Sequence, residues 1–517
     1  MKRHRTANAP DLLLRLDPTS PHPRYRQLYG GLRDAILTGR LAPGTHLPSS
    51  RVLAADLQIA RNTVTLAFEQ LRAEGYVEGN RGAGTRVTRT LPATLLRMPP
   101  QTLDTRVRPT LMRPLSARGA ALVATAAAWG FPTGTAPTAF RFGTPAIDEF
   151  PSALWARLTA RRWKRAALVL AEGQVAGYTP LRQEIAAYVT AVRGVRCTSE
   201  QVLIVNGSQQ ALDLAARVLL DPGDAVWVEN PGYLGARGAL ASAGARLVPV
   251  PVDGEGLSVE TGIKLAPHAR LVYVSPSHQY PLGVTMSAAR RLALLSWASR
   301  ADAWVLEDDY DSEFRYTGRP LACLQGLDVE GRVLYLGTFS KTLLPALRLG
   351  YIIVPEGLVD AFLAARAVAD RHSPTLEQAV LADFIAEGHF TRHVRRMRTL
   401  YAERQACLLE AARRELDGVL ELAPADAGMH LVGWLPHNII DRDITNAAAA
   451  LGVEVLPLSR YAMNPLSRGA LLLGYAGFNP AAIRSGVIRL AAVLRQARKV
   501  NASVARGRPR TRSASHR

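Results

Sequence analysis

The 517-residue sequence predicts two folded parts: a small head of three helices and a β-hairpin, then a large α/β domain on a mainly parallel sheet. Three observations predict this arrangement. The chain is longer than one ordinary domain. Apolar residues near the N-terminus recur at helical spacing and then give way to a glycine-rich turn. Beyond residue 140, short apolar strands alternate with helix-length segments, which is typical of a sheet with helices on both faces.

The sequence divides into four predicted segments. Residues 20–89 form the head, and residues 90–137 form a proline-rich linker. Residues 138–497 form the large domain, which includes a smaller C-terminal α+β part. Residues 498–517 form a basic tail that we expect to be disordered, because it contains few residues that could build a core.

Composition excludes several classes of protein. No run approaches the eighteen apolar residues of a membrane-spanning helix, and the N-terminus lacks the apolar stretch of a signal peptide. Cys197, Cys323 and Cys407 lie far apart, without the spacing of a metal or redox site. These features predict a cytoplasmic protein with no bound metal and no membrane partner.

The net charge of +20 is concentrated at the ends of the chain. Residues 1–90 carry +7, residues 91–138 carry +4 and residues 495–517 carry +8, which leaves about +1 for the rest. A nearly neutral body with basic extensions suggests that a polyanion binds the extensions alone. For the tail, the alternative is that its arginines are merely solvated.

The head has the pattern of a winged helix-turn-helix. Apolar residues from Leu28 to Ile36 recur at helical spacing, Ser49 or Ser50 can cap a second helix, and a third begins around Arg61. The stretch GYVEGNRGAGTRV then predicts two short strands joined by a glycine-rich turn. Three helices followed by a hairpin can place the third helix in the major groove of DNA.

The predicted DNA contacts lie at the starts of two helices and at the tip of the hairpin. The start of the third helix reaches base edges and nearby phosphates, and the start of the second suits a backbone phosphate. These contacts are Arg51, Arg61, Asn62, Thr63, Thr65, Arg81 and Gly82. Taken singly, Arg61 is an ordinary surface charge. The ordered set LPSSRVLA, ARNTV, EGYV and GAGTRV, however, resembles the DNA-binding domain of the GntR regulators, which implies binding as a pair to a repeated operator.

Distinctive polar residues of the large domain follow its predicted strands, where ligands of such sheets bind. The stretch NGSQQA follows the strand QVLIVN and opens a helix, which makes an anion site suited to phosphate. The stretch VLEDDYDSEF ends another strand with five acids within residues 307–313. A simple helix cap and a solvated acidic loop are the ordinary alternatives.

Lysine is rare in this chain, with five lysines against fifty-eight arginines. Lys341 lies in GTFSKTLLPALRLGY, between small hydroxyl residues. A lysine can lose its proton and attack a carbonyl, whereas an arginine cannot be deprotonated in a protein. With the phosphate site and the acids, this lysine fits pyridoxal 5'-phosphate, whose aldehyde needs an amine and whose ring nitrogen needs a carboxylate. An ordinary core or surface lysine is the alternative.

Residues 140 to about 494 resemble a fold-type I aminotransferase. The resemblance implies that Lys341 forms the aldimine with the cofactor, that Asp308 rather than Glu307 or Asp309 lies beside the ring nitrogen, and that Tyr310 meets the phenolic oxygen. It further implies that the phosphate and ring are surrounded by Ser208, Gln209, Thr338, Ser340, Arg348 and Tyr233. It also implies that Tyr178 of GYTPLR reaches the phosphate of the neighbouring subunit in a two-fold dimer.

A winged helix fused to such a domain is the organisation of the MocR-type regulators, and SPSHQYPLG and EDDYDSEFRY resemble that subgroup. The resemblance implies a homodimeric transcription regulator that depends on pyridoxal phosphate. It would bind double-stranded operator DNA and sense a small amine or amino-acid effector through Lys341. Such a protein is expected in the bacterial cytoplasm, at the nucleoid when bound to DNA.

Two alternatives remain open: a working aminotransferase, and a regulator that senses pyridoxal phosphate itself. Against the first, Tyr280 stands where many enzymes of this fold have an asparagine, and Leu472 where they commonly have a carboxylate-binding arginine. The absence of an arginine at Leu472 also argues against an effector bound like an ordinary α-amino acid. In the tail, RGRP resembles an AT-hook, which lies in narrow AT-rich minor grooves, although a solvated tail is the simpler interpretation.

Overall fold

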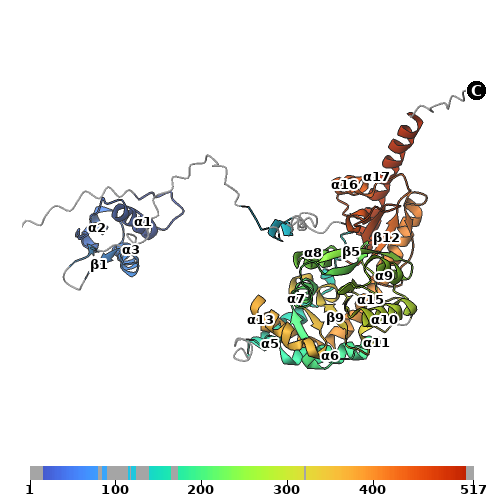
Figure 1. Cartoon of the computed structure of the whole chain (residues 1–517). Helices are drawn as coiled ribbons and strands as arrows, with labels where there is room; N and C mark the ends of the chain where they lie inside the picture. The colour runs from blue at the N-terminus through green and yellow to red at the C-terminus, as the bar shows by residue number, and fades with distance from the viewer. Residues whose placement is uncertain are drawn as a thin grey trace, which may run out of the picture. The chain divides into compact units, whose positions relative to one another are not determined.

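The structure is a computed structural model of the whole chain. It describes residues 16–79, 84–89, 114–116, 118–120, 122–123, 139–164, 173–318 and 322–507. The chain divides into two compact units, Met1–Arg113 and Pro114–Arg517 (Figure 1). Predicted residues Arg81 and Gly82, most of the predicted linker and residues 508–517 lie outside the described residues.

The first unit contains the three predicted helices, α1 (Arg24–Leu37), α2 (Ser50–Asp56) and α3 (Arg61–Ala73). Their apolar stripes meet in one core that includes Leu32, Leu53 and Phe68. Of the two candidate caps of α2, Ser49 is the one used, because its side chain accepts a hydrogen bond from the Val52 N–H. The helical spacing of apolar residues therefore predicted the head correctly.

The hairpin of the head consists of β1 (Val77–Glu78) and β2 (Arg86–Val87), which pair antiparallel. His46 adds an isolated antiparallel bridge to Arg86, so the turn before α2 is joined to the hairpin. An ion pair between Arg86 and Glu78 spans the two strands, with Nε and Oε1 2.8 Å apart. These contacts join the base of the predicted wing to the turn before α2.

An eight-stranded mixed sheet forms the centre of the second unit, in the order β3-β10-β9-β8-β7-β4-β5-β6. Neighbours from β9 to β5 pair in parallel, as predicted, whereas β10 runs antiparallel to both β3 and β9. The strands are β3 (Val202–Val205), β4 (Ala225–Asn230), β5 (Arg246–Asp253), β6 (Gly256–Leu257), β7 (Leu271–Val274), β8 (Trp304–Asp309), β9 (Val333–Thr338) and β10 (Gly350–Ile353).

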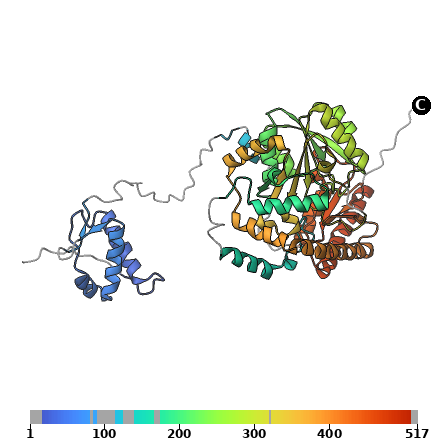
Figure 2. The ribbon, with the colours of Figure 1, turned by 90° about the horizontal axis from the view of Figure 1, so that it is seen from below.

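Helices cover both faces of this sheet, as Figure 2 shows for the second unit. Side chains alternate between faces along a strand. On β4, Val226 and Val228 pack with α7 and α8, while Trp227 turns to the other face and stacks on Trp297 of α10 with ring centres 3.7 Å apart. The helices are α5 (Ser152–Trp163), α6 (Thr179–Arg193), α7 (Ser208–Leu219), α8 (Leu234–Ser242), α9 (Val259–Leu265), α10 (Ala288–Ala301), α11 (Leu324–Leu327), α12 (Phe339–Thr342), α13 (Val359–Ala369) and α14 (Thr375–Ala386).

A smaller α+β part follows, as predicted, on a four-stranded antiparallel sheet in the order β11-β12-β14-β13. Its elements are α15 (His389–Glu415), β11 (Glu421–Leu422), β12 (His430–Trp434), α16 (Asp441–Ala450), β13 (Leu456–Pro457), β14 (Ala470–Gly474) and α17 (Pro480–Gly507). The predicted start of the tail at residue 498 is wrong, because α17 continues to Gly507. No helix in the described part of the chain is long and apolar enough to cross a membrane.

Candidate functional site

The head presents four of the predicted DNA-contacting residues at the N-terminus of α3. Arg61 and Asn62 are exposed there, whereas Thr63 and Thr65 are half-buried. The Arg61 Nε donates to the Ser50 Oγ at 3.3 Å, and the Thr65 Oγ1 donates to the Arg61 carbonyl at 3.1 Å. Arg51 is exposed on the first turn of α2. The described DNA candidates therefore lie on the two neighbouring helix starts.

The second unit contains a cavity of about 530 Å³ at the carboxyl ends of the central strands. Nine of the ten predicted cofactor-binding residues line it. They are Ser208, Gln209, Tyr233, Asp308, Tyr310, Thr338, Ser340, Lys341 and Arg348. The tenth, Tyr178, does not line the cavity in this chain. Its hydroxyl lies 3.4 Å from the Arg162 Nη1, and its N–H donates to the Gln378 Oε1 at 2.8 Å.

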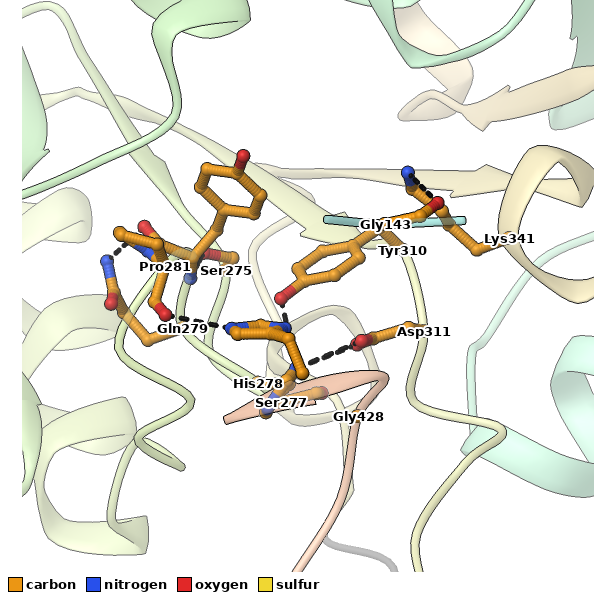
Figure 3. Close-up of polar contacts among 12 residues, drawn as sticks. Gly143, Ser275, Ser277, His278, Gln279, Pro281, Tyr310, Asp311, Lys341 and Gly428 are labelled. Carbon is orange, nitrogen blue, oxygen red and sulfur yellow. Dashed lines mark hydrogen bonds and ion pairs between the residues drawn. The ribbon is translucent and has the colours of Figure 1, made fainter. Parts of the chain in front are cut away.

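Lys341 lies on α12, directly after β9, and its Nζ donates a hydrogen bond to the Gly143 carbonyl at 2.9 Å (Figure 3). Burial lowers the pKa of this amine below its usual range, although the negative charges of Asp311 and Asp308 oppose the shift. A lowered pKa increases the fraction of the unprotonated amine, which is the nucleophilic form.

The acids at the end of β8 have different partners, and these partners show which acid faces the cavity. Glu307 accepts from the Leu324 and Gln325 backbone N–H groups, and Asp309 pairs with the buried Arg193 at 2.8 Å. Asp308 alone of the three lines the cavity. Its Oδ2 accepts a hydrogen bond from the Tyr273 hydroxyl at 2.8 Å. The sequence motif alone did not determine which of the three acids would lie beside the ring nitrogen. The geometry of the cavity favours Asp308.

The helix start, hydroxyls and cation predicted to hold a phosphate lie at one end of the cavity. Helix α7 begins at Ser208, directly after Gly207, whose φ of 89° suits a glycine. A Cβ on Gly207 would come 3.3 Å from the Arg348 Nη2, so the glycine leaves room for that guanidinium. Arg348 donates to the Asn206 carbonyl at 2.7 Å, which orients it beside the helix N-terminus. This end of the cavity suits an anion.

Aromatic rings also line the cavity. Tyr280 lies edge-on to Tyr233, Tyr461 and Phe142, with ring centres 5.2–5.4 Å apart, and its hydroxyl is 3.3 Å from that of Tyr461. Leu472 does not line the cavity; it is fully buried on β14. The cations on this side are instead Arg141, which pairs with Glu454 at 2.7 Å, and Arg460.

Several cavity residues were not predicted from the sequence, including Tyr273, Arg141, Glu454 and Tyr461. A hydroxyl in the otherwise apolar strand LVYV was a signal that could have drawn attention to Tyr273. Arg141 and Glu454 carry no such signal, because they are 313 residues apart and meet only in the fold.

Comparison with known proteins finds the same two parts. Residues 24–87 match the family described as "Bacterial regulatory proteins, gntR family", and residues 152–462 match "Aminotransferase class I and II". The chain is 45% identical over 480 residues to the "Probable rhizopine catabolism regulatory protein MocR" of Rhizobium meliloti, covering 92% of this chain and 94% of that protein. This chain belongs to the MocR-type regulators. The predicted fold class and the predicted class of transcription regulator are thereby confirmed.

Two further relatives illustrate the two halves of this MocR-type chain. It is 30% identical over 476 residues to the "HTH-type pyridoxine biosynthesis transcriptional regulator PdxR" of Corynebacterium glutamicum, covering 92% of this chain and 96% of that protein. The solved kynurenine aminotransferase of Pyrococcus horikoshii, in complex with PMP, superposes with a TM-score of 0.65 at 30% identity, covering 75% of this chain and 96% of that one. The family and fold confirm the predicted cofactor, pyridoxal 5'-phosphate.

The residues of the MocR-type chain fit this cofactor. Asp308 Oδ1 and Ser340 Oγ are buried and have no hydrogen-bond partner within the described residues. Buried polar atoms without partners are costly. A protonated ring nitrogen would give Asp308 a donor, and a phosphate oxygen would give the Ser340 hydroxyl an acceptor. Both orphaned atoms therefore match groups that the cofactor carries.

Replacing Asp308 by asparagine should change how the stability of the cofactor-free protein depends on pH. Burial raises the pKa of Asp308 to about 7, from 3.8. The folded state then binds a proton more tightly than the unfolded state, so this carboxyl destabilises the fold as pH rises from about 4 to about 7. One such group contributes a slope of up to about 1.4 kcal/mol per pH unit.

We therefore expect Asp308→Asn to gain stability relative to the parent protein as pH rises through that window. Chemical unfolding of both proteins at several pH values measures this difference. Glu307 and Glu313, whose pKa values are also raised, are present in both proteins and cancel in the comparison. The charge of Asp308 helps to raise the pKa of Glu229, so Asp308→Asn also lowers the pKa of Glu229, which adds to the expected gain in stability. Parallel pH profiles would contradict the buried, protonatable environment assigned to Asp308.

Proposed function

We propose that this chain is a homodimeric regulator that binds pyridoxal phosphate at Lys341 and changes its operator binding when an amine effector enters the cavity. One observation carries the proposal: the half-buried Lys341 amine and the Asp308 carboxyl line the same cavity as the helix start at Ser208, which suits a phosphate. The same chain has a GntR-type head. A site for a reactive aldehyde and a DNA-binding head together make a sensor.

Each group in the cavity has a distinct part in this proposal. Ser208, Thr338, Ser340 and Arg348 bind the phosphate and so fix one end of the cofactor. Asp308 holds a proton on the ring nitrogen, and the aromatic face of Tyr233 packs beside the ring. Bound pyridoxal phosphate supplies an electrophilic carbon that exchanges one amine for another. Lys341 provides the resident amine, which an effector amine would replace.

The effector amine must distinguish two states of the protein in order to regulate it. A ligand changes an equilibrium only by the difference in its affinity for the two states. In this proposal the two states differ in whether the Lys341 amine is bonded to the cofactor or free. The aromatic wall around Tyr280 and the Arg141–Glu454 pair contact whatever group the effector carries beyond its amine.

The DNA-binding part of the proposal assigns the N-terminus of α3 to the major groove. Arg61 and Asn62 read base edges, Thr63 and Thr65 contact nearby phosphates, and Arg51 contacts the backbone from α2. We assign Arg81 and Gly82, outside the described residues, to the wing tip. Two heads in a dimer would read a repeated operator at the nucleoid, and Tyr178 would complete the partner's phosphate site.

Arg61→Ala should weaken operator binding by about 1–3 kcal/mol and relax base preference at one position. The physical reason is that an exposed guanidinium at the start of a recognition helix can donate two hydrogen bonds to one guanine. The operator is first obtained by sequencing genomic DNA retained by the protein, and affinity is then measured at fixed salt.

Arg72→Ala is the matched control, because Arg72 is an exposed arginine in the last turn of the same helix. Because Arg72 lies at the other end of α3, Arg72→Ala should weaken operator binding much less than Arg61→Ala does. An unchanged footprint and unchanged affinity for Arg61→Ala would remove Arg61 from the interface. Light scattering of the purified protein separately tests the dimer, and a monomer at every concentration would contradict it.

A further inference from the structure

A second set of polar contacts lies directly behind the cavity and involves a histidine that the proposed function does not use. The Tyr310 hydroxyl, which lines the cavity, lies 3.0 Å from the Nδ1 of His278. The same Nδ1 lies 3.0 Å from both carboxyl oxygens of Asp311. Figure 3 shows the three side chains pointing toward one another. His278 and Asp311 are only 2% and 1% exposed.

The position of the imidazole proton follows from these neighbours. An ionised carboxylate is only an acceptor, so an unprotonated Nδ1 facing two carboxylate oxygens would place lone pairs against lone pairs. An Nδ1–H satisfies the Asp311 carboxylate and can also donate to the Tyr310 oxygen. The Nε2 has no partner within the described residues. The contacts therefore place a proton on Nδ1.

Two glycines leave the space that this ring occupies. A Cβ on Gly428, whose φ is 95°, would come 2.0 Å from the Cε1 of His278. A Cβ on Gly283 would come 3.1 Å from its Nε2. The ring is thus held by close backbone approach on two sides, which restricts its rotation and keeps Nδ1 directed at Tyr310 and Asp311.

We propose that His278 and Asp311 are positioning residues that orient the Tyr310 hydroxyl toward the cavity. Because the Tyr310 oxygen accepts from His278, its own proton is free to point away from the imidazole. Asp311 holds the proton on His278 Nδ1, so that this direction is kept. The inference rests on the proposed function, since the hydroxyl then donates to the phenolic oxygen of the cofactor.

The surroundings of Tyr310 agree with a donor role. Burial raises its pKa well above 10, and the negative charges of Asp311 and Asp308 raise it further, so the phenol keeps its proton. A neutral hydroxyl that is oriented before the ligand binds loses less rotational freedom on binding. The expected consequence is tighter cofactor binding and a visible absorption maximum that depends on His278 as it does on Tyr310.

A double-mutant cycle between His278 and Tyr310 in the full-length protein tests this role. His278→Leu removes the donor, and Tyr310→Phe removes the hydroxyl. His278→Asn places an amide N–H close to the position of Nδ1 and serves as the conservative variant. The control is His430→Leu, since His430 is also buried, lies 5.3 Å from the His278 ring, and bonds the Pro281 carbonyl instead of Tyr310. Each protein is titrated with pyridoxal 5'-phosphate and followed by visible absorbance.

We expect His278→Leu to weaken retention of pyridoxal phosphate about three- to tenfold, the worth of one net hydrogen bond, and to shift the absorption maximum as Tyr310→Phe does. In the Tyr310→Phe background the same substitution should change affinity less than about twofold. His278→Asn should restore most of the affinity and the absorption maximum, and His430→Leu should change neither.

Three results would overturn the inference: equal affinity and spectrum for His278→Leu and the parent protein, additive losses in the double variant, or the same shift in His430→Leu. If the parent protein itself binds no pyridoxal phosphate, the proposed function fails instead. The two failures are therefore distinguishable within one set of titrations.

Discussion

Lys341→Ala should abolish the visible absorbance that the parent protein acquires from pyridoxal phosphate, while leaving the folded head intact. Lys341 is the only lysine among the residues that line the cavity in the described part of the chain. Lys341 is half-buried, and burial lowers the pKa of its amine. Among the described residues no other amine lines the cavity, so the absorbance should be lost completely and not only in part. Absorbance after dialysis measures it, and circular dichroism reports the fold.

Lys264→Ala provides the control for this experiment. Lys264 lies on α9, is 70% exposed and pairs with Glu260 one helical turn away, so it has no part in the cavity. It should keep the full visible absorbance. A Lys341→Ala protein that retained the absorbance, or a Lys264→Ala protein that lost it, would show that another amine holds the cofactor.

The second large effect is on DNA: operator affinity should differ between protein saturated with pyridoxal 5'-phosphate and protein saturated with pyridoxamine 5'-phosphate. The first has an aldehyde that bonds Lys341, and the second has an amine that leaves Lys341 free. Coupling between two sites is typically 1–3 kcal/mol, so the expected difference is about 5- to 150-fold.

The structure contains a contact through which the state of Lys341 can act. The Lys341 amine donates to the Gly143 carbonyl, and the chain just before Gly143 is tied to the C-terminal part. The Glu454 N–H donates to the Ala139 carbonyl at 2.9 Å, and the Gly474 N–H donates to the Phe140 carbonyl at 3.0 Å. Residues 139–143 follow the predicted linker directly. An amine bonded elsewhere cannot hold Gly143 in the same way.

Local patterns in the sequence were sufficient to predict most of the fold. The helices of the head and the parallel strands of the large domain have clear periods, and chemistry-bearing residues follow strands whose carboxyl ends meet at one sheet edge. Strand β10 (Gly350–Ile353) was not predicted; it returns antiparallel beside β9, outside the alternation of parallel strands and helices that the prediction followed. The continuation of α17 to Gly507 was also missed.

Cavity residues were predicted where one sequence motif indicates both the place of a residue in the fold and the chemical role of its side chain, as around Lys341. They were missed where the contact depends on strand order or distant pairing. Tyr273 reaches Asp308 only because β7 and β8 are neighbours in the sheet, which the sequence does not specify. His278 reaches Tyr310 from a loop 32 residues earlier. The roles of the predicted residues in binding cofactor and DNA remain predictions that the experiments above test.

One measurement tests the central claim most directly: operator affinity of the full-length protein at fixed salt with each of the two cofactor forms, in the parent protein and in Lys341→Ala. Binding of each form is verified independently by equilibrium dialysis. We expect at least about a fivefold difference in the parent protein, which disappears in Lys341→Ala. Equal operator affinity with both forms bound to the parent protein would contradict the claim that operator binding depends on whether Lys341 is bonded to the cofactor.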